Sequence, residues 1–408
     1  MGWRATARPS AAAALCAAWL AFAAATACAA ATATADSSAV VLPLADPVAA
    51  PPSTVPRAPA GWETLSTGLP EEARLKLLPA FRYNRVDGAT PGVGIAFQSE
   101  RDPAPYVYAG GSYATGRDRF LGAAGFEAPI GDPTWLRAGA DVFRRTQSED
   151  LWIVGEMENS IFALVARTDY LDHYEATGFA GHLVFEPGRD VALRAAIRIQ
   201  DESSLPTRVR FSVFGKEDRF RQNPPVEAGD EGLVSVSARI GPARIPRGGG
   251  TTGTLGYERA GGFMGRDFDY GRLRGEGRAL HRFSPRRALR ARVFAGSTRE
   301  GRLPQQKIWH VGGIGTLRGH DYKAFSGDQF FLMNSEYRSR VRKNLFPFAF
   351  LDWGAAWFGA GNLDRQRPGL DGGVGLSVGE DALAVTVARD LRRAGAPFLV
   401  GVRVGGSF

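Results

Sequence analysis

The feature that most limits how this chain can fold is an alternation of apolar and polar residues, repeated in short segments along most of its length. Residues 191–200 show it clearly, because every second position is apolar: Val191, Leu193, Ala195, Ile197 and Ile199. A period of two places the apolar and polar sets on opposite faces of a β-strand. The same pattern recurs in residues 233–240, 289–296 and 398–408. The chain is therefore predicted to be all-β.

Two classes of all-β protein show this alternation, soluble sandwiches and transmembrane barrels. No run of about 18 apolar residues follows position 78, so transmembrane helices are excluded from that part of the sequence. The large number of strands, a secretion signal and a terminal aromatic residue favour the barrel. The 51 glycines fit this class, because glycine suits crowded and strongly curved strands.

The order of strands and loops predicts how many strands the barrel has. Fifteen strands are recognisable after residue 90, and the three longest loops, 146–176, 201–231 and 298–327, all follow even-numbered ones. A chain with both ends in the periplasm needs an even number of strands and has its long loops outside. Residues 80–87, AFRYNRVD, supply the missing first strand. We therefore predict a 16-stranded antiparallel transmembrane β-barrel, with five strands after the last long loop.

The first of the long loops contains a helical pattern. Ile161, Leu164 and Val165 have helical spacing within residues 152–167, and glutamates lie near the start of this segment. A short helix over the mouth of the barrel is expected, with a packing role.

The N-terminal residues have the organisation of a secretory signal peptide. Arg4 and Arg8 precede an alanine-rich apolar run, and small residues at 27–29 offer a cleavage site. Cys16 and Cys28, the two cysteines of the chain, fall in this segment. The mature chain is therefore expected to contain no disulfide and no thiolate metal site.

Composition divides the chain into three parts. A signal peptide is expected at 1–29, and a disordered periplasmic linker at 30–78, because this segment is rich in Ala, Pro, Ser and Thr and lacks periodicity. A short helix is predicted at 70–78, where glutamates occupy the first turn. The outer-membrane β-barrel is expected at 79–408.

One stretch departs from the strand pattern. Residues 311–322, VGGIGTLRGHDY, are rich in glycine and lie between two alternating segments. Such a density of glycines and turn formers indicates a loop, and Leu317, Arg318, Gly319 and His320 form its tip.

Two later motifs supply carboxylates for this tip. NSEYR at 334–338 and FLDWG at 350–354 lie on consecutive predicted strands, and alternation places Glu336 and Asp352 side by side on the inner wall. A guanidinium is a planar fork that can bind two carboxylates. Arg318, folded inward on its loop, is therefore their expected partner.

These motifs, together with the terminal Phe408, resemble the barrel domain of the BamA/TamA-like outer-membrane insertase family, also called bacterial surface antigens. The resemblance extends well over residues 312–408 and in outline over the rest of the barrel. It implies an inward-folded long loop whose arginine reaches the wall carboxylates and whose tip helps assembly and function. Relatives carry periplasmic transport-associated domains before the barrel, and residues 30–78 are too few for one. A barrel domain alone is therefore expected.

The resemblance implies a location in the bacterial outer membrane and a task in assembling or translocating proteins or lipids there. The expected route is a weak seam where the first strand, AFRYNRVD, meets the last, FLVGVRVGGSF. The expected partners are outer-membrane lipid, an unidentified client protein or lipid, and the outer-membrane assembly machinery. That machinery would read a C-terminal targeting signal of Val402, Val404 and Phe408.

The alternative is a passive anion-selective pore, because arginines dominate the predicted inner face. This inward set is Arg194, Arg198, Arg239, Arg272, Arg274, Arg278, Arg290, Arg292, Arg338, Arg340 and Arg403. A positive lumen would attract anions, whereas the competing interpretation is a wall whose charges pair with one another. Basic residues are dispersed and form no run, so nucleic acid is not an expected partner.

Catalysis is not expected from this sequence. The chain contains no G-x-S-x-G motif and no pair of histidines at metal-ligand spacing. His320 stands where relatives usually have Phe or Tyr, so a packing contact is the expected role of its ring. We therefore expect no enzyme activity, no cofactor and no metal.

Overall fold

The computed structural model describes residues 74–98, 106–131, 135–188, 190–215 and 219–405, all within one compact unit, 45–408. The predicted signal peptide at 1–29 and most of the predicted linker at 30–78 lie outside the described residues. Phe408 lies outside them as well.

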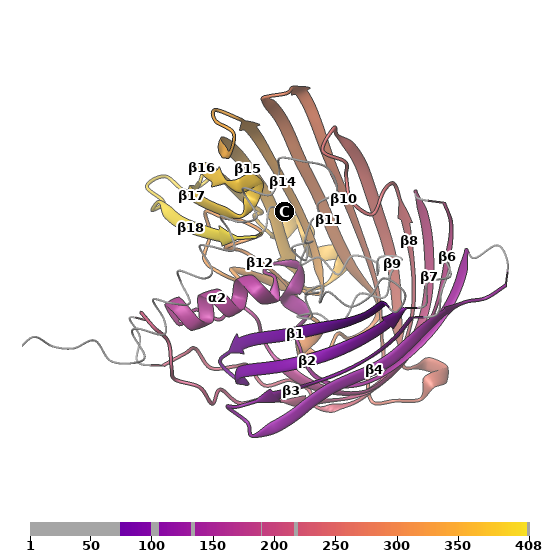
Figure 1. Cartoon of the computed structure of the whole chain (residues 1–408). Helices are drawn as coiled ribbons and strands as arrows, with labels where there is room; N and C mark the ends of the chain where they lie inside the picture. Colours follow the sequence, from indigo (N-terminus) through magenta and orange to yellow (C-terminus); the bar gives the residue numbers. More distant parts are fainter. Residues whose placement is uncertain (1–73, 99–105, 132–134, 189, 216–218, 406–408) are drawn as a thin grey trace, which may run out of the picture. The chain divides into compact units, whose positions relative to one another are not determined.

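Sixteen strands form one antiparallel sheet in which each strand pairs with the next along the chain (Figure 1). They are β1 (Arg74–Asn84), β2 (Gly88–Gln98), β3 (Tyr106–Ala114), β4 (Arg119–Pro129), β5 (Leu136–Gln147), β6 (Tyr174–Gly188), β7 (Val191–Ser204), β8 (Gly229–Ile240), β9 (Gly250–Ala260), β10 (Tyr270–Ser284), β11 (Arg287–Gly301), β14 (Gln329–Ser339), β15 (Leu345–Trp357), β16 (Gly369–Val378), β17 (Leu383–Asp390) and β18 (Leu399–Val404). The predicted number is confirmed, as are the five strands after the long loop.

The alternation of the sequence becomes a difference between the two faces of the sheet. On β14, Met333 and Tyr337 are about 40% exposed, whereas Asn334 and Glu336 between them are buried. On β15, Leu351 and Trp353 are similarly exposed on either side of the buried Asp352. An apolar outer face and a polar inner face are what a lipid-embedded barrel wall requires.

The start of the sheet differs from the prediction. β1 begins at Arg74 instead of residue 80, so the helix predicted at 70–78 is wrong for residues 74–78, and the barrel starts before residue 79. The reason is tertiary pairing, since Arg74–Leu78 lies opposite Gly94–Gln98 of β2 and this ladder overrides a weak helical preference. The strand also ends earlier, because the side chain of Asn84 accepts hydrogen bonds from the next turn.

Several loops carry secondary structure of their own. The β5–β6 loop contains η1 (Glu149–Trp152) and α2 (Glu156–Ala166). The long loop, residues 302–328, contains η3 (Gln305–Lys307) and the hairpin of β12 (Trp309–Val311) and β13 (Phe325–Gly327). Three further 3-10 turns are η2 (Gly262–Met264), η4 (Ala360–Arg365) and η5 (Gly379–Asp381). None of the helices in the described ranges is long and apolar enough to cross a membrane.

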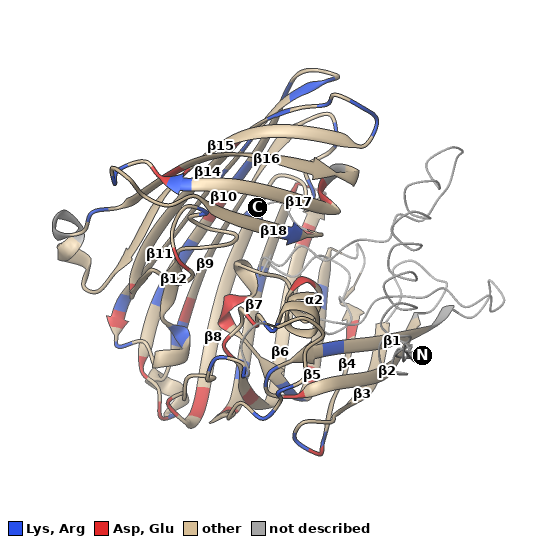
Figure 2. Ribbon diagram, turned by 90° about the vertical axis from the view of Figure 1, so that its left-hand side faces the viewer, with Lys and Arg blue, Asp and Glu red and all other residues tan. Residues whose placement is uncertain are grey.

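The sheet is interrupted at one place. β1 and β18 are the two ends of the strand order, and no ladder joins them in the part of the chain that the structure describes. α2 lies between these two edge strands (Figures 1 and 2). The short helix in this loop is therefore confirmed, but its expected position over the mouth is wrong, because it lies at the seam between the first and last strands. Unpaired strand edges need other partners, and α2 supplies them.

Candidate functional site

The hairpin of β12 and β13 carries the loop tip to the inner wall of the sheet. Gly312, Gly313 and Gly315 all have positive φ angles, which only glycine adopts without strain, so the chain can fold back on itself there. Leu317 is fully buried in an aromatic cluster with Trp309, and this apolar anchor fixes the tip. The cluster also contains Trp152, Phe294, Phe330 and Leu332, which come from the β5–β6 loop, β11 and β14.

Arg318 binds both carboxylates that the sequence indicated. Its Nε and Nη2 donate to the two oxygens of Asp352 at 2.7 Å each, and its Nη1 donates to Glu336 Oε1 at 2.6 Å. Asn334 on the inner face also donates to Asp352, at 2.8 Å. The structure thus brings together the predicted residues of β14, β15 and the long loop.

The surroundings strengthen this contact. The guanidinium carbon of Arg318 lies 3.6 Å from the centroid of the Phe350 ring, which is a cation–π contact with a buried aromatic side chain. Burial alone lowers the pKa of Arg318, but the charges and hydrogen bonds of Asp352 and Glu336 together outweigh burial, so this pKa stands above its ordinary value. The fork is therefore a permanently charged and largely desolvated contact.

The sequence did not indicate the partner of the other two tip residues, Asp371 on β16. The N–H of Gly319 donates to one oxygen of Asp371 at 2.6 Å, and His320 Nδ1 lies 2.8 Å from the other. This hydrogen bond raises the pKa of His320 above its ordinary value. A side chain at position 319 would collide with the backbone of Arg389, so only glycine permits the approach.

His320, Asp371 and Asp390 form a group whose ligand atoms lie within 4.8 Å of one another, close enough for a metal ion. Hydrogen bonds account for the arrangement, because Asp371 already receives donors from two tip residues and His320 Nε2 lies 3.7 Å from Asp390. Their common effect is to attach the tip to β16 and β17.

A second charge cluster, also missed by the sequence interpretation, holds the base of the long loop. Lys307 is fully buried, and its Nζ lies 2.9 Å from Glu202, 3.0 Å from Glu149 and 3.3 Å from Glu231. These carboxylates come from three distant segments, and no local sequence pattern around Lys307 predicts that they lie close to it. The long loop is thus held by charge at both its base and its tip.

Most arginines on the described inner wall are held in ion pairs, some of which share one carboxylate, as Arg278 and Arg292 share Glu276. Nine of the eleven predicted inward arginines form ion pairs: Arg198, Arg239, Arg272, Arg274, Arg278, Arg290, Arg292, Arg338 and Arg403. Figure 2 shows charges of both signs along the strands. The interpretation of a wall with paired charges is therefore the one that the structure favours.

The predicted C-terminal signal is only partly within the described residues. Val402 and Val404 lie on β18 and are half-buried, and Val400 on the same face is exposed. Phe408 belongs to the residues that are not described.

Comparison with known proteins places this geometry in a structural class. No protein-family model matches the chain, and no curated protein matches it. A solved structure of BamA from Haemophilus ducreyi lacking POTRA domains 1–3 matches with a TM-score of 0.57 at 12% identity, over 81% of this chain and 69% of that one. The fold is therefore a BamA-like β-barrel, as both the sheet with its inward long loop and this match indicate. The predicted resemblance is therefore confirmed at the level of the fold.

Two further solved structures are CdiB proteins. CdiB from Acinetobacter baumannii has 12% identity and a TM-score of 0.45, and CdiB from Escherichia coli has 14% and 0.47. The matches cover 82% and 83% of this chain but only 60% and 63% of the respective CdiB chains.

Proposed function

We propose that this protein works in the bacterial outer membrane, where it assists the assembly or translocation of proteins or lipids at the seam between β1 and β18. The observation that carries the proposal is the interruption of the sheet at this seam. Strand edges without a continuous ladder can pair with an incoming segment. The BamA-like fold supports the same location and the same class of activity.

The long loop contributes a fixed inner support in this proposal. Its tip is held on β14 and β15 by Arg318 and on β16 by Asp371, close to the C-terminal side of the seam. A rigid support keeps the neighbouring wall in place while the seam opens. The proposal involves no catalytic chemistry, cofactor or metal.

A passive anion-selective pore is the competing function, and the paired arginines weaken it. An ion-selective wall needs charge that is free to attract the ion, whereas most of these side chains are held in ion pairs with nearby carboxylates. We therefore favour assembly.

The test uses the purified full chain in lipid vesicles and a urea-unfolded eight-stranded outer-membrane barrel as the client probe. Folding of the probe is followed by heat-modifiable electrophoretic mobility. We expect faster insertion than in empty vesicles. A variant with Glu158→Cys and Arg403→Cys, in a chain with Cys16→Ser and Cys28→Ser, is then joined by a short bismaleimide across the seam.

The crosslinked form should lose the acceleration, and the same variant without crosslinker serves as its control. Full activity after crosslinking would show that the seam does not open. A steady anion-selective current in a planar bilayer, with no assisted insertion, would establish the pore instead.

The C-terminal residues have a separate place in this proposal. We infer that Val402, Val404 and Phe408 form the signal that the cell's assembly machinery reads. Deletion of Phe408 should leave the protein in the periplasm, whereas normal heat-modifiable folding of the deletion in membranes would contradict the inference.

A further inference from the structure

Helix α2 contacts the two edge strands with opposite faces. Successive helical residues are about 100° apart, so Glu156, Ser160 and Ala163 share one face and Glu158 points the other way. The first face meets β1, and Glu158 meets β18. Met157, which lies between these faces, is 42% exposed. The helix thus occupies the interruption in the wall like a short additional element.

The attachment of α2 to β1 has several components. Glu156 pairs with Arg82 at 3.2 Å, and Ser160 Oγ accepts a hydrogen bond from the backbone N–H of Tyr83 at 3.1 Å. Ala163 is fully buried in a cluster with the Tyr83 ring.

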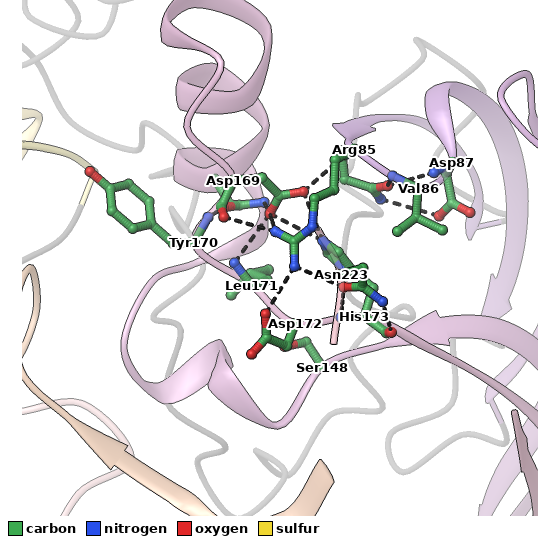
Figure 3. Close-up of polar contacts among 12 residues, drawn as sticks. Arg85, Val86, Asp87, Ser148, Asp169, Tyr170, Leu171, Asp172, His173 and Asn223 are labelled. Atoms are coloured by element: carbon green, nitrogen blue, oxygen red, sulfur yellow. Dashed lines mark hydrogen bonds and ion pairs between the residues drawn. The ribbon is translucent and has the colours of Figure 1, made fainter. Parts of the chain in front are cut away.

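The chain just after α2 is also fixed to β1, as Figure 3 shows. Arg85, in the turn after β1, is fully buried. It donates to the backbone carbonyl of Asp169 at 2.9 Å, and its own N–H donates to the Asp169 carboxylate at 2.9 Å. Arg85 also binds Asp172 and Asn223, at 2.9 and 2.8 Å. α2 and the turn after β1 therefore form one connected body.

Helix α2 is attached to β18 through a single side chain. Within the described residues, the hydrogen bonds and ion pairs between α2 and β18 all involve Glu158. Its carboxylate binds Arg403 through Nε at 2.8 Å and Nη2 at 3.0 Å, and it accepts the backbone N–H of Val404 at 2.8 Å. Glu158 is 3% exposed and Arg403 is 8% exposed.

A helix is a poor permanent partner for a strand edge. Its backbone N–H and C=O groups are used in its own hydrogen bonds, so α2 can offer the edge of β18 only a side chain. An extended segment offers a whole ladder of backbone hydrogen bonds. The contact between α2 and β18 is therefore one that an incoming strand can replace.

We propose that α2 is a displaceable latch: it stays with β1, and release of Glu158 from Arg403 exposes the outer edge of β18 to an extended segment of a partner polypeptide. This inference rests on the proposed function and names the regulation of its seam. The partner must alternate, with apolar residues beside the exposed Val400, and it must bring a carboxylate to replace Glu158 at Arg403.

The latch also adjoins the loop tip. Arg403 and Arg318 line the same cavity of about 20 Å³, together with Glu336. The fixed tip and the releasable latch therefore meet at one point of the inner wall.

The test measures hydrogen–deuterium exchange of single backbone amides by NMR, with the full chain in lipid nanodiscs. The latch variant is Glu158→Ala, and the matched control is Glu156→Ala, on the same helix but facing β1. We expect Glu158→Ala to accelerate exchange at Val404 about tenfold while Tyr83 stays protected, because only the β18 side opens. Glu156→Ala should leave Val404 unchanged. If the yield of Glu158→Ala is low, Glu158→Gln provides the same comparison.

The second half of the proposal is that the exposed edge of β18 binds an extended segment. It is tested with a peptide of sequence LAVTVARD, the sequence of β17, which pairs with the other edge of β18 in the intact sheet. The peptide should restore protection of Val404 in the Glu158→Ala variant, with an affinity about tenfold higher than for the unmodified protein. A second peptide, LEVTVARD, has a glutamate at the position that opposes Arg403 in this register, and it should bind more tightly because it brings a carboxylate to that side chain. A scrambled peptide is the sequence control.

Three results would overturn the latch: unchanged exchange at Val404 in Glu158→Ala, equal acceleration in both variants, or protection by the peptide at Tyr83 instead of Val404. The vesicle assay separates this failure from that of the proposed function. If the protein accelerates insertion of the probe although α2 does not leave β18, the latch is refuted and the assembly function stands. Displacement of α2 by the peptide without assisted insertion would refute the assembly function and leave the latch in place.

Discussion

An arginine–carboxylate fork holds both the loop tip and helix α2, but the sheet behind the two contacts differs. Arg318 binds Asp352 and Glu336 on β15 and β14, which pair with each other in an unbroken part of the sheet. Glu158 binds Arg403 on β18, which has no neighbouring strand on one side among the described residues. The same chemistry therefore stabilises a loop in one place and closes a seam in the other. The effect of a salt bridge therefore depends on whether the strands on which it lies are paired on both sides.

The two contacts also differ in how many other interactions support them. The tip has an apolar anchor in Leu317, an aromatic ring beneath Arg318 and further hydrogen bonds to Asp371. The β18 side of α2 depends on Glu158. We therefore expect substitutions at the tip to change stability and substitutions at the latch to change mainly the closure of the seam.

The largest loss of stability is expected for Arg318→Ala. It leaves two buried carboxylates without their shared cation, which costs about 3–5 kcal/mol in a desolvated site. The measurement is the free energy of unfolding from a urea titration in micelles, with protease sensitivity of the long loop as a second readout. Arg299→Ala, at an exposed position on β11, is the control.

Arg318→Lys should recover little of this loss, because an ammonium lacks the planar fork. Full recovery with lysine would show that charge alone holds the tip, and the geometric argument would then fail.

A double-mutant cycle should show that the tip behaves as a unit. Asp352→Asn and Arg318→Ala remove the same contact, so the combined loss should fall short of the sum by about 0.5–3 kcal/mol. The same urea titration on four proteins gives the coupling energy. Strict additivity would mean that Arg318 does not bind Asp352 in the folded protein.

A smaller loss of stability is expected for Glu158→Ala. This substitution leaves one buried cation, Arg403, without its carboxylate, whereas Arg318→Ala leaves two buried carboxylates without their cation, and α2 keeps its attachment to β1. Thermal unfolding should therefore shift less than in Arg318→Ala. A greater loss than in Arg318→Ala would reverse the comparison between tip and latch.

The smallest effect is a pH dependence at His320. Its hydrogen bond to Asp371 raises its pKa, so the stabilisation is complete below the unfolded-state pKa of about 6.5 and is lost as pH rises through the folded-state value. The difference in thermal stability between the unmodified protein and His320→Gln should therefore grow as the pH is lowered from about 8.5 to about 5.5. A difference independent of pH would mean that the ring acts by packing alone.

Much of the sheet could be predicted from sequence because its rules are local. Alternation, turns and the parity of the strand count require no knowledge of distant residues, and they led to sixteen strands and to the inner positions of Glu336 and Asp352. The fork at Arg318 was accessible because its partners lie on two consecutive strands next to the loop.

The features that escaped prediction depend on long-range contacts. Lys307 meets carboxylates 76 to 158 positions away, and Glu158 meets Arg403 across 245 positions. The local pattern at 74–78 predicts a helix, but these residues pair with β2, and a local pattern does not display that pairing. Strand register and seam partners are set by packing, which a single sequence does not display.

The buried turn after β1 has a consequence for the order in which the chain folds. Arg85 has its partners 84, 87 and 138 residues later, at Asp169, Asp172 and Asn223. During synthesis, the earliest strand therefore waits for the middle of the chain before its end is complete, and contacts of such long range form slowly. β1, although made first, is therefore completed only after the chain has been made as far as Asn223.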